Sequence, residues 1–190
     1  KVPASKIEVG TNGVYADAFR AEGADIQALG APLAERDFVV GYVGTHGLAH
    51  GLEIVLDAAE ALRGERIRFV LTGSGAKKQE LMTEASQRGL TNVEFMAPVP
   101  RSDLARILSQ SDVALVPLKR ARAFQTVIPS KIFEAAAAGR PVLLGVEGQA
   151  RSLLDQYRAG LAFEPEDAAG LVVAIRTLRS DGSLYAECQA

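Results

Sequence analysis

The sequence is poor in the residue types that build metal centres and disulfide frameworks. Its 190 residues include one cysteine, Cys188, and two histidines, His46 and His50. A single cysteine excludes an internal disulfide and fits a reducing compartment, so we expect a cytoplasmic protein. The two histidines are spaced i, i+4, yet no further histidine or cysteine completes a tetrahedral site. We therefore expect no metal ion and no cofactor.

Charge of one sign and long apolar runs are also scarce. The formal net charge is -2, which excludes general attraction to nucleic acid. No uninterrupted apolar stretch approaches the ~20 residues that a membrane-spanning helix needs, and none has the pattern of a signal peptide. Hydrophobic residues make up 48% of the chain, enough for one sizeable domain with a real core. Any anion site must therefore be local.

Strand-like and helix-like patterns alternate from residue 37 onward. Short apolar runs predict strands at residues 38–44, 67–71, 93–96, 113–118, 142–146 and 160–163. Helical spacing predicts helices near residues 52–62, 77–88, 129–138, 150–157 and 167–178, and Ser102 is expected to cap a further short helix. This order predicts an α/β domain over residues 37–190, with a doubly wound, mainly parallel, Rossmann-like sheet and helices on both faces.

Residues 1–36 are different in character. They are rich in glycine and alanine, have no sustained period and carry a turn signal at Thr11-Asn12-Gly13. We expect a lead-in or interdomain segment with at most a short strand at Ile7–Val9, and we expect that another part of a longer protein precedes it.

One helix carries polar side chains at the edge where such sheets bind ligands. Ligands of such sheets bind beyond the carboxyl ends of the strands. The predicted loops at this edge are residues 44–51, 73–75, 97–100 and 119–130. Pro129 suits the first turn of the next helix, Ser130 is expected to cap it, and Gly139 ends it. Lys131 and Glu134 share a face with Ser130.

This arrangement favours an anion at the start of the helix. Free amides, the positive end of the helix dipole and the Lys131 ammonium would attract a phosphate. The Glu134 carboxylate, one turn further, would suit a hydroxyl-rich sugar. An ordinary surface pair of Lys131 and Glu134 is the alternative interpretation.

The glycine-rich loops match no standard nucleotide motif. The loop from Gly44 to Gly51 fits neither the Walker pattern nor G-x-G-x-x-G. Gly73-Ser-Gly75 opens like a dinucleotide fingerprint, but Lys78 stands where the third glycine belongs, which argues against an NAD site.

The two histidines have several possible roles, and the positions of two aspartates exclude one class of protein. For His46 and His50, a loop hydrogen bond, a phosphate or sugar contact, and plain solvent exposure are all compatible with the sequence. Asp37 and Asp112 precede their strands, which places them at the amino edge of the sheet. A receiver-type phosphoacceptor domain needs aspartates at the opposite edge, so this function is excluded.

Several separated motifs together resemble one protein family. They are Val9 to Val14 with Phe19, Gly41 to Gly44, Phe69 to Gly75, Asn92 to Phe95, Ser111 to Pro117, Pro129 to Val142, and Ala159-Gly160. In this order the chain resembles the carboxyl-terminal, donor-binding domain of retaining glycosyltransferases with the GT-B fold, in the family 4 group. The run from Pro129 to Glu134 is most similar to transferases that build bacterial surface sugars.

The resemblance implies a nucleotide-sugar donor, UDP- or GDP-linked, and a role for each part of the carboxyl edge. The diphosphate is implied to bind at Gly44, Gly47, Ile128, Pro129, Ser130 and Lys131. Glu134 matches the second acid of the family's E-x7-E motif and is implied to bind the ribose. The base would face Gly73, Gly75, Ala97, Pro98 and Val99, and the donor sugar would face Thr126 and Val127. Further cation contacts are implied for His50, Arg122 and Lys78.

The sequence departs from the family pattern in two regions. Thr126 stands where relatives have the first acid of E-x7-E, and Thr45 and His50 occupy the region where relatives place cations. The implied activity is hexosyl transfer to an acceptor hydroxyl with retention and without a metal. The partner would be an amino-terminal GT-B domain that this chain lacks, which would also bring any peripheral membrane contact. A nucleotide-sugar 2-epimerase fragment and a non-catalytic nucleotide-binding or interaction domain are the alternatives.

Overall fold

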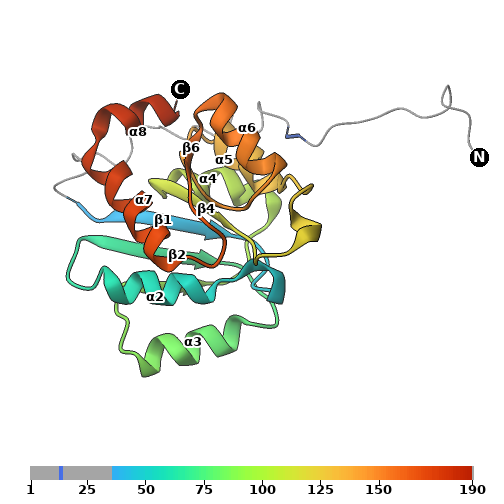
Figure 1. Ribbon diagram of the computed structural model, residues 1–190. Coiled ribbons are helices and arrows are strands. Elements are labelled where there is room, and N and C mark those ends of the chain that lie inside the picture. The colour runs from blue at the N-terminus through green and yellow to red at the C-terminus, as the bar shows by residue number, and fades with distance from the viewer. Residues whose placement is uncertain (1–12, 15–35, 190) are drawn as a thin grey trace, which may run out of the picture.

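Six parallel strands form the central sheet in the computed structural model, which describes residues 13–14 and 36–189 (Figure 1). The strands are β1 (Phe38–Val43), β2 (Ile67–Thr72), β3 (Val93–Met96), β4 (Val113–Pro117), β5 (Val142–Gly145) and β6 (Gly160–Ala162). Their order is β3-β2-β1-β4-β5-β6, and every neighbouring pair is parallel. The predicted doubly wound sheet is confirmed, and its order reverses between β1 and β4. The predicted strand at Ile7–Val9 and nearly all of the lead-in lie outside the described residues.

Helices cover both faces of the sheet, as predicted. One face packs against α2 (Glu53–Ala61), α3 (Lys78–Gln87), α7 (Ala168–Ser180) and α8 (Gly182–Gln189). The other packs against α4 (Leu104–Ser109), α5 (Ser130–Ala137) and α6 (Gln149–Tyr157), as Figure 1 shows. Short 3-10 turns are η2 (Leu48–His50), η3 (Arg101–Asp103) and η4 (Arg122–Phe124). The helix α8 was not predicted from the sequence.

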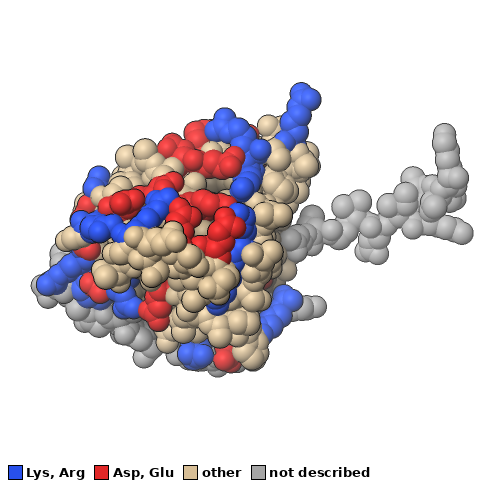
Figure 2. Space-filling view, turned by 90° about the horizontal axis from the view of Figure 1, so that it is seen from below, with Lys and Arg blue, Asp and Glu red and all other residues tan. Residues whose placement is uncertain are grey.

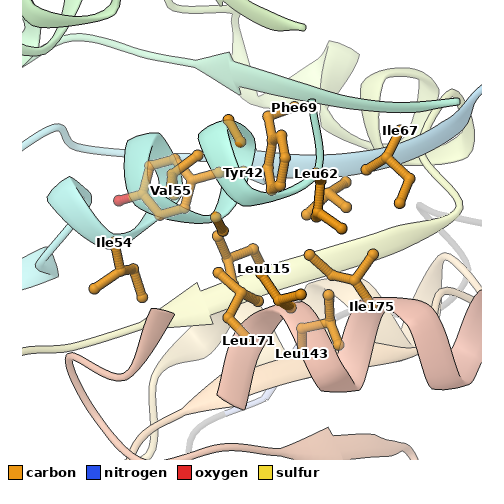
Figure 3. Packing of buried hydrophobic residues seen from close by; sticks show 14 of the residues in the cluster. Tyr42, Ile54, Val55, Leu62, Ile67, Phe69, Leu115, Leu143, Leu171 and Ile175 are labelled. Carbon is orange, nitrogen blue, oxygen red and sulfur yellow. The ribbon is translucent and has the colours of Figure 1, made fainter. Parts of the chain in front are cut away.

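The strands read as unbroken apolar runs because both sheet faces are buried. Along β1, Phe38, Val40 and Tyr42 point into the larger core, where they meet α2 and α7. Figure 3 shows Tyr42, Leu115 and Ile175 of α7 in this core. Burial of each large side chain contributes about 1.5–3 kcal/mol relative to exposure, so this core holds the strand ends of the carboxyl edge in place.

Both serine caps predicted from the sequence are wrong. Pro129 itself occupies the N-cap position of α5 with φ -63° and ψ 134°, and Ser130 is the first helical residue without a capping hydrogen bond. A capping side chain must belong to the non-helical residue that precedes the first turn, so Ser130 comes one residue too late. Ser102 lies inside η3, which runs directly into α4, and neither element has a side-chain cap.

The other end of α5 follows its prediction. Gly139 has a φ of 62°, a left-handed conformation that glycine adopts without steric cost, and its N–H donates to the carbonyl oxygen of Ala136. The chain then turns into β5.

Asp112 lies at the amino edge of the sheet, as predicted, and has a structural role there. Its side chain is fully buried and one carboxylate oxygen accepts hydrogen bonds from Nη1 of Arg36 (2.8 Å) and the backbone N–H of Val39 (2.7 Å). The other carboxylate oxygen pairs with Nη2 of Arg36. This pairing raises the pKa of Arg36 and ties the start of β1 to the residue before β4.

The face that carries α2 and α3 mixes charges of both signs. Figure 2 shows basic and acidic side chains interspersed on this face, with no continuous patch of one sign. Arg88 at the end of α3 contacts Asp57, Glu60 and Glu84, for example. Among the described residues, no helix is both long and apolar enough to cross a membrane.

Candidate functional site

Two adjoining hollows lie where the carboxyl ends of β1 and β2 meet the start of α5. The α5 hollow, of about 290 Å³, is lined by Val43, Gly44, Thr45, Val99, Pro100, Arg101, Leu104, Ser130, Lys131 and Glu134. The β2 hollow, of about 210 Å³, is lined by Val43, Gly44, Thr45, Thr72, Gly73, Ser74, Pro98 and Val99. Four residues belong to both, so the hollows form one carboxyl-edge cleft at the predicted edge of the sheet.

Lys131 supplies the positive charge of the α5 hollow. Its side chain is partly buried, and Nζ lies 5.7 Å from the centroid of the Tyr42 ring, within range of a cation–π contact. Burial lowers the pKa of Lys131, which Glu134 partly offsets. No carboxylate in the described part of the chain forms an ion pair with this ammonium. A partly desolvated cation without a salt bridge is suited to an anionic ligand.

The space for Lys131 depends on Gly44. A Cβ at Gly44 would lie only 2.4 Å from Cε of Lys131, and Gly44 also has a positive φ of 148°. A larger residue would displace the lysine stem from the end of β1. Ser130 and Glu134 line the same hollow, one turn apart, so the shared face predicted for Ser130, Lys131 and Glu134 is confirmed.

The β2 hollow is built by close backbone contacts between loops. Gly73 has a φ of 146°, and a Cβ there would lie 1.9 Å from the carbonyl oxygen of Gly44. The N–H of Gly44 donates to the carbonyl oxygen of Thr72 (2.9 Å), and the N–H of His46 donates to that of Ser74 (2.8 Å). The loops after β1 and β2 are therefore joined at their backbones, which fixes the floor of the hollow.

His46 lies beneath these loops and not in solvent. Its side chain is fully buried, and its ring is 5.7 Å from that of Tyr42 and 6.3 Å from that of Phe95. Burial lowers the pKa of His46 to about 4, with a further contribution from the charge of Lys78. The imidazole is therefore neutral near pH 7, and solvent exposure is excluded for this histidine.

The ring of His50 also packs against that of Tyr42, at a centroid distance of 6.3 Å. Its pKa is lowered by burial and by the charge of Lys131. Its Nδ1 atom is buried, and no hydrogen-bond partner for it occurs among the described residues. His50 does not line either hollow.

The family model for glycosyl transferases group 1 matches residues 37–181. The chain belongs to this family. It is 34% identical over 158 residues to WcaI of Escherichia coli K12, a glycosyl transferase provisionally assigned to colanic acid biosynthesis; the match covers 80% of this chain and 39% of WcaI. The O-antigen chain mannosyltransferase C of Escherichia coli is 32% identical over 143 residues, which cover 72% of this chain and 36% of the enzyme. The chain thus spans less than half the length of these relatives.

Solved structures place the fold of this group 1 domain among glycosyltransferases. Anabaena HepE, crystallised with UDP and glucose, matches with a TM-score of 0.76 at 23% identity, over 99% of this chain and 51% of HepE. WaaG, a glycosyltransferase of lipopolysaccharide biosynthesis, also has a TM-score of 0.76, at 18% identity, over 98% of this chain and 51% of WaaG. The fold is therefore the carboxyl-terminal half of a GT-B architecture.

The structure brings together seven of the residues that the sequence nominated. These are Gly44, Gly73, Pro98, Val99, Ser130, Lys131 and Glu134. The structure does not bring the others into the lining of either hollow: Gly47, His50, Gly75, Lys78, Ala97, Arg122, Thr126, Val127, Ile128 and Pro129. Among these, Arg122, Thr126 and Val127 are exposed on the loop between β4 and α5.

Arg101 was missed by sequence analysis. It begins η3, is exposed, and lines the α5 hollow together with Lys131. The only signal in the sequence was a basic residue directly after Pro98-Val-Pro100. Its membership of the cleft depends on how this turn approaches α5, and local sequence does not determine that approach.

Proposed function

We propose that this chain is the donor-binding domain of a retaining glycosyltransferase that uses a nucleotide-diphosphate sugar. The observation that carries the proposal is the α5 hollow, in which Lys131 and Glu134 lie beside the amides of the first turn of α5. The diphosphate binds the Lys131 ammonium and these amides. The Glu134 carboxylate accepts hydrogen bonds from the ribose hydroxyls, and the base enters the β2 hollow.

The same groups account for a catalytic contribution. When the bond between the sugar and the diphosphate breaks, negative charge develops on the leaving diphosphate. Lys131 and the amides of the first turn of α5 belong to the folded site before this charge develops, so they stabilise the transition state more than the ground state. Arg101, at the mouth of the α5 hollow, adds a second positive charge.

Other parts of the activity belong to the longer enzyme. An amino-terminal domain supplies the acceptor site, so the chain by itself binds donor and does not transfer sugar. The similarity to enzymes named for colanic acid and O-antigen synthesis supports a role in bacterial surface polysaccharide synthesis. The absence of a metal requirement and a cytoplasmic location remain predictions from the sequence.

Binding of UDP, GDP and ADP to the 190-residue chain tests the proposal. We expect one nucleotide to raise the free energy of unfolding by about 2.7 kcal/mol when present at about 100 times its Kd. A crystallised carboxyl-terminal domain of the group 1 protein LpcC from Francisella tularensis, with a TM-score of 0.70, supports working with the isolated domain. If none of the three nucleotides stabilises the chain, the proposal is refuted and an interaction role for the domain is favoured.

Glu134→Gln tests the ribose contact. We expect its Kd for the preferred nucleotide to rise about tenfold, because a charge-assisted acceptor is lost. The same nucleotide lacking ribose hydroxyls should bind wild type and variant equally. Glu187→Gln is the matched control, since Glu187 lies on α8 and pairs with Arg158. An unchanged Kd for Glu134→Gln would remove this residue from the ribose role.

A further inference from the structure

Lys78 joins the ends of two adjacent strands with one ammonium group. It is the first residue of α3, and its side chain is partly buried. Nζ donates hydrogen bonds to the backbone carbonyl oxygens of Gly73 (2.7 Å) and Met96 (2.5 Å). Gly73 directly follows β2, and Met96 is the last residue of β3. The two hydrogen bonds therefore connect the end of β2 to the end of β3.

These two strand ends lead into two different segments of the lining, or walls, of the β2 hollow. Gly73 and Ser74 form one wall, and Pro98 and Val99, which follow Met96 closely, form the other. The direct backbone bond between the N–H of Gly73 and the carbonyl oxygen of Met96 is long, at 3.3 Å. A charged donor makes stronger hydrogen bonds than a neutral one, so the Lys78 ammonium is the firmer connection between the walls.

Lys78 has no competing acidic partner in the described part of the chain. Its neighbour Lys77 behaves differently, because its ammonium pairs with Glu80 at 2.6 Å and Glu53 at 3.7 Å. The two adjacent lysines thus have different partners. Lys77 forms ion pairs with carboxylates of α2 and α3, whereas Lys78 donates to backbone carbonyl oxygens at the ends of β2 and β3.

We propose that Lys78 is a positioning residue for the nucleobase, because its ammonium sets the separation of the two walls of the β2 hollow. It acts through Gly73 and Met96 and does not touch the ligand. This inference rests on the proposed function, since it takes the β2 hollow as the base side of a nucleotide site. It replaces the diphosphate contact that the sequence implied for Lys78, because the ammonium bonds to two backbone carbonyl oxygens and Lys78 lines neither hollow.

Substitution of Lys78 is therefore expected to change the affinity for some nucleotides more than for others. UDP, GDP and ADP share the ribose and the diphosphate and differ only in the base. Loosening the walls of the β2 hollow weakens recognition of the fitting base and leaves the α5 hollow intact. The preferred nucleotide should therefore lose affinity, whereas the other two should change little.

The experiment measures Kd values for UDP, GDP and ADP by calorimetry with the wild-type chain, Lys78→Met and Lys77→Met. We expect Lys78→Met to raise the Kd of the preferred nucleotide about tenfold and to change the other two less than about threefold. Lys77→Met, which removes the same charge from the adjacent residue, should leave all three values within about twofold. Lys78→Gln replaces Lys78→Met if the latter lacks a cooperative unfolding transition.

The outcomes separate the two proposals. An equal loss for all three nucleotides, an unchanged preference in Lys78→Met, or a wild-type chain without any preference would overturn the role of Lys78. A wild-type chain that binds none of the three nucleotides would instead overturn the proposed function, before any variant is compared.

Discussion

The neutral state of His46 predicts a specific dependence of stability on pH. The imidazole is fully buried between the rings of Tyr42 and Phe95, and its pKa in the folded chain is about 4. In the unfolded chain this pKa returns to about 6.5. Between these values the unfolded chain binds more protons than the folded chain, so acidification favours unfolding. The stabilisation is complete above pH 6.5 and is lost as the pH falls toward 4.

The size of the effect follows from the pKa difference. A difference of about 2.5 pKa units corresponds to about 3.4 kcal/mol over the full range, at about 1.36 kcal/mol per unit. For these two pKa values, about 2 kcal/mol of this should already be lost between pH 8 and pH 5. This is a large share of the stability of an ordinary domain.

Urea unfolding followed by circular dichroism at pH 8, 7, 6 and 5 measures this loss. The matched variant is His46→Gln, which cannot take up the proton, with His50 retained in both proteins because its pKa is lowered as well. Carboxylates titrate equally in both, so the difference between the two curves isolates His46. We expect the wild type to lose about 2 kcal/mol more than the variant between pH 8 and pH 5. Parallel curves would show that His46 is not held neutral by burial.

Two further substitutions separate binding from stability. Lys131→Met should raise the Kd of the preferred nucleotide about tenfold or more, measured by calorimetry, without lowering the free energy of unfolding, because it removes a partly desolvated charge; a marked loss of stability would contradict this. Asp112→Ala should lower the free energy of unfolding by about 3 kcal/mol in urea, because it removes the buried carboxylate that accepts from Arg36 and from the N–H of Val39. Its nucleotide Kd should stay within about twofold, since Asp112 lies at the opposite edge of the sheet, and a larger change would show coupling between the edges.

Much of the architecture was predictable because it is encoded by local patterns. Unbroken apolar runs such as residues 38–43 and 142–145 are typical of strands whose two faces are both covered by helices. A helix between two successive strands returns the chain to the same end of the sheet, so the strands are parallel. The position of α5 followed from Pro129 and Gly139, whose backbone preferences are intrinsic to each residue. The edge that holds the cleft followed from the alternation of strands and helices, because ligands of doubly wound sheets bind beyond the carboxyl ends of the strands.

The details of caps and short ends were less predictable. Ser130 and Ser102 both looked like caps because serine is a good capping residue, but capping depends on which residue leaves the helical conformation. At α5 that residue is Pro129. At α4 the 3-10 turn η3 directly precedes the helix, so Ser102 lies inside this turn and not at the cap position. The last helix, α8, has little contrast between its faces and gave no periodic signal in the sequence.

Sequence by itself determined the family, the sheet, and the helix that brings Ser130, Lys131 and Glu134 onto one face. Only the tertiary structure decided where the other polar side chains point. It buried His46 beneath the loops, placed Arg101 in the α5 hollow and directed Lys78 to two backbone carbonyls. The physical reason is that backbone preferences act within a few residues, whereas the partner of a long polar side chain is set by segments that meet only in the folded chain.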